Sequence, residues 1–188
     1  MRKEMRYIQV AAFVIVSLVY LSVRALPFAS SQNGANTVST KDGFYYVERV
    51  VDGDTLKLSG QQRVRLIGID TPEVHYSQKL FKDAERSHRE IKTIQALGKK
   101  ASDFTKNLCF GRKVRLEFDV EKRDRYGRLL AYVYLEDGTF VNAKIMEEGF
   151  AQIMTVPPNV KYSDYFLKLQ KEARESGRGL WGMKDGLR

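Results

Sequence analysis

The chain has 188 residues, of which 43% are hydrophobic and 11% aromatic, enough for one folded domain with a single core. Its 32 Lys and Arg against 23 Asp and Glu give a formal net charge of +9, which indicates a phosphate-bearing partner or an anionic membrane surface without choosing between them. The single cysteine, Cys109, excludes an internal disulfide, and its apolar neighbours predict a buried small side chain rather than a nucleophile.

Residues 1–31 are predicted to be a signal peptide or an N-terminal membrane anchor. Three basic residues precede an apolar run over residues 7–23, as expected for a hydrophobic helix at the start of an exported protein. Basic residues before the run favour a cytoplasmic N-terminus, so the remainder is expected to be extracytoplasmic. Small residues at Ala29 and Ser31 favour cleavage and secretion. Retention would instead attach the protein to the membrane through residues 7–23.

Residues 32–43 are polar and rich in turn formers, which predicts a flexible linker before a folded domain over residues 44–188. Runs of β-branched and aromatic residues predict strands, and apolar spacings of three and four predict helices. The predicted strands cover 44–51, 55–58, 62–69, 113–118 and 128–135, and the predicted helices cover 101–108, 142–149 and 163–177. Five strands with a helix after the third predict an α+β fold built on a small closed barrel of the oligonucleotide-binding (OB) type, preceded by the hydrophobic N-terminal helix.

Acidic residues gather at two predicted strand ends, in "VVDGDT" (residues 50–55) and "IDTPE" (residues 69–73). Each motif has a structural alternative, because Asp-Gly favours a tight turn and Thr71 followed by Pro72 can begin a helix. A three-strand meander can nevertheless bring Asp54 and Asp70 together at one rim of the barrel. Two carboxylates and a backbone carbonyl, with no His or Cys, form an oxygen site for Ca²⁺ or Mg²⁺ rather than zinc. His75 and His88 are predicted to be solvent-exposed.

Two arginines complete the candidate site, Arg65 on the strand before Asp70 and Arg128 after the turn "DRYG". The planar guanidinium matches phosphate oxygens in two-point contacts. Five residues separate Arg65 from Asp70, so in one regular strand the two side chains would face opposite sides. A shared site therefore requires an irregularity at Gly68, or Asp70 beyond the strand end.

The motifs "VVDGDTLKL", "VRLIGIDTPE" and "DRYGRLLAYVY", followed by "VNAKIMEEGFA", resemble the staphylococcal (micrococcal) nuclease or thermonuclease family. The resemblance covers residues 44–181. It implies an OB-fold barrel with about three helices and Ca²⁺-dependent hydrolysis of DNA and RNA, with little sugar or sequence specificity, that leaves 3′-phosphates. It places one metal ion on Asp54, Asp70 and the carbonyl of Thr71; Mg²⁺ and Mn²⁺ stay open from the residues alone. The implied catalytic residues are Arg65, Glu73 and Arg128.

The chain departs from the family pattern in two places. Residues 74–100 form a longer segment, expected to be a solvated insertion that partly extends the following helix; a minority hypothesis is that it holds substrate. Met154, Thr155 and Pro157 occupy the neighbourhood where the secreted members carry stacking tyrosines, so weaker base stacking is expected there. Arg125 and Tyr126 are candidate substrate-binding residues, although Tyr126 can equally pack against its own loop.

The leading hypothesis is thus an extracytoplasmic, monomeric nuclease acting on DNA and RNA. The alternatives are a non-catalytic nucleic-acid-binding OB-fold module, and a membrane-tethered interaction protein. The first alternative requires lost site residues, whereas all six implied positions carry the expected residue type. The second explains the N-terminus but not the acidic residues and arginines.

Overall fold

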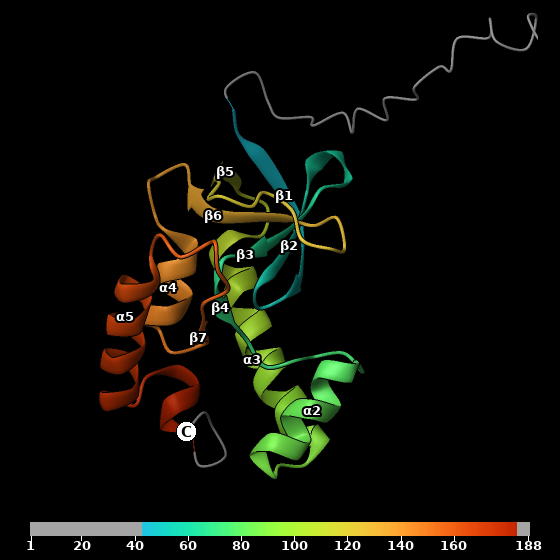
Figure 1. Ribbon diagram of the computed structural model, residues 1–188, viewed down its shortest axis with the longest axis vertical. Coiled ribbons are helices and arrows are strands. Elements are labelled where there is room, and N and C mark those ends of the chain that lie inside the picture. The colour runs from blue at the N-terminus through green and yellow to red at the C-terminus, as the bar shows by residue number, and fades with distance from the viewer. Residues whose placement is uncertain (1–42, 184–188) are drawn as a thin grey trace, which may run out of the picture. The chain divides into compact units, whose positions relative to one another are not determined.

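The computed structural model describes residues 43–183. Five strands close into a barrel in the order β1-β2-β3-β6-β5, with β5 pairing back onto β1 (Figure 1). Neighbouring strands are antiparallel except β3 and β6, which run parallel. This α+β barrel confirms the predicted OB fold. The barrel strands are β1 (Tyr45–Asp52), β2 (Thr55–Leu58), β3 (Arg63–Leu66), β5 (Lys113–Glu117) and β6 (Leu129–Leu135).

Apolar side chains from all five strands fill the barrel, because alternate residues of each strand point inward. Burial of this surface is the main stabilising contribution to the fold. The barrel residues that are at most 5% exposed include Val47, Leu56, Leu58, Val64, Leu66, Val114, Leu129, Ala131, Val133 and Leu135.

The prediction of one strand over residues 62–69 is wrong, because the strand is interrupted after Leu66. Gly68 has a φ of +82°, a left-handed conformation that favours glycine, and a Cβ added there would collide with the ring of Phe166. Beyond the break, β4 (Gly68–Asp70) pairs with β7 (Gln152–Met154) in a separate antiparallel sheet. The change of direction sets where Asp70 points.

The structure contains four α-helices between residues 43 and 183, where about three were expected. The additional helix, residues 78–87, lies in the 74–100 segment, and residues 91–100 of the same segment extend the following helix, as expected. Ser77 caps its start by accepting a hydrogen bond from Leu80 N, and His88 ends it with a φ of +52°. Figure 1 shows α2 packed against α3, and α4 beside α5. The helices are α2 (Gln78–Ser87), α3 (Ile91–Cys109), α4 (Val141–Glu147) and α5 (Ser163–Glu175).

Helix α3 presents the predicted apolar face to the barrel. Ala101 is fully buried, and Phe104 and Leu108 pack partly buried against the core. Cys109 is also fully buried, and burial raises the pKa of its thiol to about 12, which confirms the structural interpretation of this cysteine. Thr105 Oγ1 donates a 2.7 Å hydrogen bond to the carbonyl of Gly53, so α3 holds the turn between β1 and β2.

The predicted N-terminal hydrophobic helix and residues 32–42 of the predicted linker lie outside the described residues. Among residues 43–183, no helix is both long enough and apolar enough to span a membrane.

Candidate active site

Arg65 is the centre of a charged cluster at the rim of the barrel. Its Nη1 lies 2.6 Å from Asp54 Oδ2, and its Nη2 donates a 2.7 Å hydrogen bond to Asp70 Oδ1. Burial alone would lower the pKa of Arg65, but the charges of Asp54 and Asp70 outweigh it and raise the pKa. Because Gly68 separates β3 from β4, the five-residue offset does not keep Arg65 and Asp70 apart.

Asp54 joins the β1–β2 turn to the segment after β4. Its Oδ2 accepts hydrogen bonds from Thr71 N at 2.9 Å and Thr71 Oγ1 at 3.0 Å, and its Oδ1 accepts one from Thr55 Oγ1 at 3.1 Å. The carboxylate is nearly buried, and burial without such donors would be unfavourable. These contacts fix Asp54 and Thr71 relative to one another, as the predicted shared rim requires.

Residues 71–77 form a loop that α3 supports from one side. Gln95 Nε2 donates a 3.0 Å hydrogen bond to Val74 O. A Cβ added at Gly98 would lie 2.6 Å from two carbonyl oxygens of the loop, so only glycine allows α3 to approach this closely. The alternative interpretation, a helix beginning at Thr71, is wrong, since α2 begins only at Gln78. The loop places Glu73 beside the other carboxylates.

Glu73 is bound by residues from the start of α2. Its Oε1 lies 3.0 Å from Lys79 Nζ, and its Oε2 accepts a 3.4 Å hydrogen bond from Ser77 Oγ. Lys79 Nζ also lies 3.0 Å from Asp70 Oδ1 and from Thr71 O. The carboxylates of Asp70, Glu73 and Asp54 raise the pKa of Lys79, although burial opposes them as the largest single influence. Sequence reasoning missed this lysine.

Asp52 adds a fourth carboxylate at the end of β1. Burial raises its pKa, and the charges of Glu73 and Asp54 raise it further. The predicted exposed position of His75 is confirmed, with Nε2 3.9 Å from Asp52 Oδ1. Negative charge therefore concentrates at this rim, around what we call the carboxylate cluster (Asp54, Asp70 and Glu73).

The second predicted catalytic arginine, Arg128, lies in the connection between β5 and β6, within what we call the arginine loop (residues 123–128). Its Nε donates a 2.6 Å hydrogen bond to Asp124 Oδ2, while Asp124 Oδ1 accepts from the backbone N–H groups of Tyr126 and Arg128. Burial alone would raise the pKa of Asp124, but the hydrogen bonds and charge of Arg128 lower it overall. Arg128 thus has one local carboxylate partner.

The predicted substrate-binding residues lie at the tip of the arginine loop. Tyr126 is 69% exposed, and the guanidinium groups of Arg125 and Arg128 lie 4.8 and 5.6 Å from the centre of its ring. Arg125 Nη2 also donates a 2.7 Å hydrogen bond to the Tyr126 hydroxyl. The ring is therefore supported by cations and presents surface to solvent.

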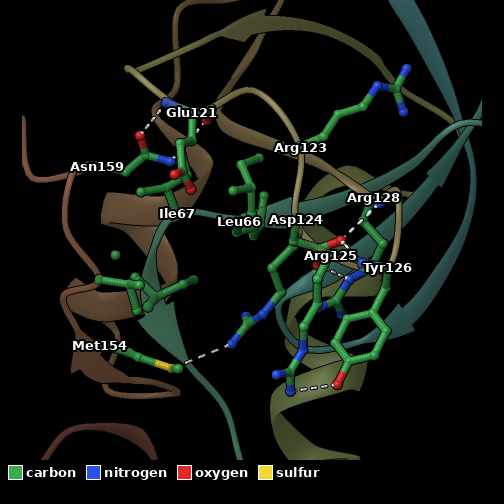
Figure 2. A pocket seen from close by; sticks show the side chains of 15 residues that line it. Leu66, Ile67, Glu121, Arg123, Asp124, Arg125, Tyr126, Arg128, Met154 and Asn159 are labelled. Atoms are coloured by element: carbon green, nitrogen blue, oxygen red, sulfur yellow. Dashed lines mark hydrogen bonds and ion pairs between the residues drawn. The ribbon is translucent and has the colours of Figure 1, made fainter.

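A cleft of about 440 Å³ joins the two arginines. In Figure 2 the arginine loop forms one side of this cleft and Met154 lies on the opposite side. Arg65 lies between the cleft and the carboxylate cluster, because it lines the cleft and contacts Asp54 and Asp70. The lining residues are Arg65, Leu66, Ile67, Gly68, Ile69, Glu121, Arg123, Asp124, Arg125, Tyr126, Arg128, Leu130, Met154, Val156 and Asn159.

The predicted metal ligands offer oxygen atoms only, which fits a hard cation. Asp70 Oδ1 and Thr71 O already converge on one positive group, the Lys79 ammonium, each at 3.0 Å. Among residues 43–183, no three or more His, Cys, Asp or Glu side chains are grouped to hold a metal ion by themselves. A cation bound here therefore has to take further ligands from carbonyl oxygens, water or a bound phosphate, as Ca²⁺ readily does.

Residues 63–183 match the family model described as staphylococcal nuclease homologue. The chain belongs to this family. A thermonuclease of Staphylococcus hyicus is 37% identical over 171 residues, covering 89% of this chain and 93% of its own. A thermonuclease of Staphylococcus intermedius is 38% identical over 185 residues, covering 96% and 99%. The SPbeta prophage-derived endonuclease YokF of Bacillus subtilis (strain 168) is 38% identical over 140 residues, covering 72% and 43%. The family and these relatives confirm the predicted enzyme class, a nuclease hydrolase.

Proposed function

We propose that the protein is a calcium-dependent nuclease that hydrolyses phosphodiester bonds in DNA and RNA with little sugar or sequence specificity and leaves 3′-phosphates. Water attacks phosphorus, the bond from phosphorus to the 5′ oxygen breaks, and the products carry a 3′-phosphate and a 5′-hydroxyl. The observation that carries the proposal is one cleft lined by both Arg65 and Arg128, with the carboxylate cluster directly behind Arg65.

The two arginines stabilise the charge that develops on the phosphate oxygens. Each guanidinium is held by a carboxylate before substrate arrives, so little reorganisation is needed when the charge develops. Arg65 is fixed from two sides, and Arg128 enters the cleft from the arginine loop. Arg125 and the exposed ring of Tyr126 bind the neighbouring nucleotide by charge and stacking.

Asp54, Asp70 and the carbonyl of Thr71 would hold Ca²⁺, which supplies positive charge beside the phosphate when bound. Glu73 then orients or deprotonates the attacking water, a task that requires hydrogen-bond reach to it. Ser77 Oγ and Lys79 Nζ, both within 3.4 Å of Glu73 oxygens, hold this carboxylate at the rim. The acidic groups are compatible with an anionic substrate because cations lie between them and the phosphate.

Digestion of plasmid DNA and of an RNA transcript tests this function directly. We expect cleavage with Ca²⁺ and none with a chelator. The fragments should accept label at the 5′ end from polynucleotide kinase without phosphatase treatment, because each carries a 5′-hydroxyl. Glu73→Gln, purified identically, should be inactive, which excludes a contaminating nuclease. Binding without cleavage by the wild-type protein, or cleavage that persists with the chelator, would contradict the proposal.

We further propose that the enzyme is a monomer that acts outside the cytoplasm, either secreted or attached to the membrane through residues 7–23. The sequence pattern of residues 1–31 supports this location. Fractionation of cells with and without prior protease treatment, followed by N-terminal sequencing, tests it. Export would be contradicted if protein with an intact N-terminus were found in the cytoplasmic fraction, protected from the protease. A dimer mass in solution scattering would contradict the monomer.

A further inference from the structure

Lys79 is placed like a bound cation within the candidate active site. Its Nζ lies 3.0 Å from three oxygen atoms: Asp70 Oδ1, Thr71 O and Glu73 Oε1. An ammonium group carries three protons, so these three acceptors satisfy it completely. Asp83 Oδ2, at 4.0 Å, is the next oxygen of an acidic side chain and belongs to the same helix as Lys79.

The fold keeps this ammonium at the rim. Lys79 lies in the first turn of α2, between the cap residue Ser77 and Leu80, whose side chain is fully buried. The side chain of Lys79 is 35% exposed, so it is partly shielded by the residues it contacts, yet has an open path to solvent. The helix is therefore fixed, while the flexible lysine stem can move the charge into or out of the cluster.

We propose that Lys79 is a resident cation of the site that competes with Ca²⁺ for Asp70 and the Thr71 carbonyl, and thereby sets the calcium affinity. This inference rests on the proposed function. Without calcium, Lys79 holds Asp70, Thr71 and Glu73 together. Calcium requires oxygen ligands at about 2.3–2.6 Å, so a calcium ion on these oxygens would lie close to the Lys79 ammonium, and the like charges repel one another. Binding must therefore move Lys79 outward.

Calorimetric titration of the full-length protein with Ca²⁺ tests the competition. If the inward position of Lys79 is populated about ten to one, its removal should tighten calcium binding about tenfold. Lys79→Met keeps most of the apolar stem and removes the charge. Lys82→Met is the matched control, because it removes an exposed lysine from the same helix, and it should change the affinity less than about twofold.

A second measurement uses the wild-type protein and does not depend on the stability of a variant. The ammonium resonances of ¹⁵N-labelled lysines are recorded by NMR, with Lys79 and Lys82 assigned from the two variants or by selective labelling. Saturating Ca²⁺ should shift or abolish the Lys79 signal, since Lys79 loses Asp70 and the Thr71 carbonyl as acceptors, and leave that of Lys82 in place.

This inference would be overturned if Lys79→Met bound calcium no more tightly than wild type. It would also be overturned if the Lys79 resonance stayed unchanged in calcium-saturated wild-type protein. Either result would leave the nuclease proposal intact. If no variant and no wild-type sample binds calcium, the proposed calcium site itself is wrong, and the role of Lys79 fails with it.

Discussion

Arg65 and Arg128 face the same cleft but are held in different ways. Arg65 is 14% exposed and contacts two carboxylates, on Asp54 and Asp70, that belong to different strand ends. Arg128 is 29% exposed and contacts Asp124, four residues earlier in its own loop. One guanidinium therefore belongs to the tertiary structure of the barrel rim, and the other to a local turn.

This difference separates stability from catalysis. Removing Arg65 would take away the cation paired with the nearly buried Asp54 and one of the two cations that contact Asp70. Removing Arg128 would leave a carboxylate, on Asp124, that is still bound by backbone N–H groups. Arg128 can thus be removed with little effect on folding, whereas Arg65 cannot. Substitutions in the two regions should affect different measurements.

Arg65→Met should cause the largest change, a loss of about 3–5 kcal/mol in the free energy of unfolding, because it removes the cation paired with the nearly buried Asp54 and leaves Asp70 with Lys79 alone. Urea denaturation at pH 7 in the presence of a chelator measures it. Added Ca²⁺ should restore part of the loss by neutralising the same carboxylates. A stability within about 1 kcal/mol of wild type would mean that the pairs with Asp54 and Asp70 contribute no more than surface ion pairs do.

Arg128→Ala should lower the rate of DNA cleavage about 10²–10³-fold, the usual effect of removing one group that stabilises transition-state charge. The variant should stay folded, because the loop retains its backbone hydrogen bonds to Asp124 Oδ1. Single-turnover cleavage assays measure the rate, and circular dichroism checks the fold. Near wild-type turnover would remove Arg128 from the site.

Asp124→Asn tests how far one local partner positions Arg128. Asn keeps an oxygen for the backbone donors but replaces the carboxylate that binds Arg128 Nε, so we expect about 1.5 kcal/mol of lost stability after allowance for partial exposure. The folded pKa of Asp124 is lowered below its usual 3.8. Its contribution is therefore complete above that value and is lost as the pH falls through the lower folded pKa.

Unfolding experiments at a series of pH values check the sign of this effect. The stability difference between wild type and Asp124→Asn should be constant near neutral pH and shrink in acid, below the unfolded pKa of Asp124. Cleavage by the variant should fall less than for Arg128→Ala, because the guanidinium remains but is less restrained. A difference that grows in acid would mean that the carboxylate is not the stabilising form.

The sequence predicted those parts of the molecule that depend on local pattern. Alternating and helical apolar spacings located the barrel strands and the apolar face of α3, on which Ala101 is buried and Phe104 and Leu108 pack against the barrel core. Strand β4 was merged with β3 and strand β7 was missed, because three residues each carry no usable alternation and their pairing joins segments far apart in the chain. The break at Gly68 was foreseen only as one of two ways to align Arg65 with Asp70.

At the site, the motifs located the acidic residues and both arginines, although their catalytic and metal-binding roles stay predictions. Lys79 was missed for a physical reason. It lies in a segment expected to be mainly a solvated insertion, and its contacts arise only because α2 begins at Gln78 after a loop supported by Gly98 of α3. If α3 ran back without interruption to residue 79, this lysine would lie elsewhere.

The smallest expected effect concerns the side of the cleft opposite the arginine loop. Of the described residues that line the cleft, Tyr126 is the only aromatic, and Met154 on β7 occupies the other side, with its sulfur 3.9 Å from Arg65 Nη2. Met154→Tyr would add a second ring for a base to stack on, worth about 1 kcal/mol or roughly fivefold in affinity. Fluorescence anisotropy with a single-stranded oligonucleotide and a chelator measures binding without cleavage. Met154→Leu is the matched control, because it keeps apolar bulk without a ring. If Met154→Tyr and Met154→Leu bind the oligonucleotide alike, bases stack on the arginine loop alone. The two sides of the cleft then differ in nucleotide binding, just as Arg65 and Arg128 differ in how they are held.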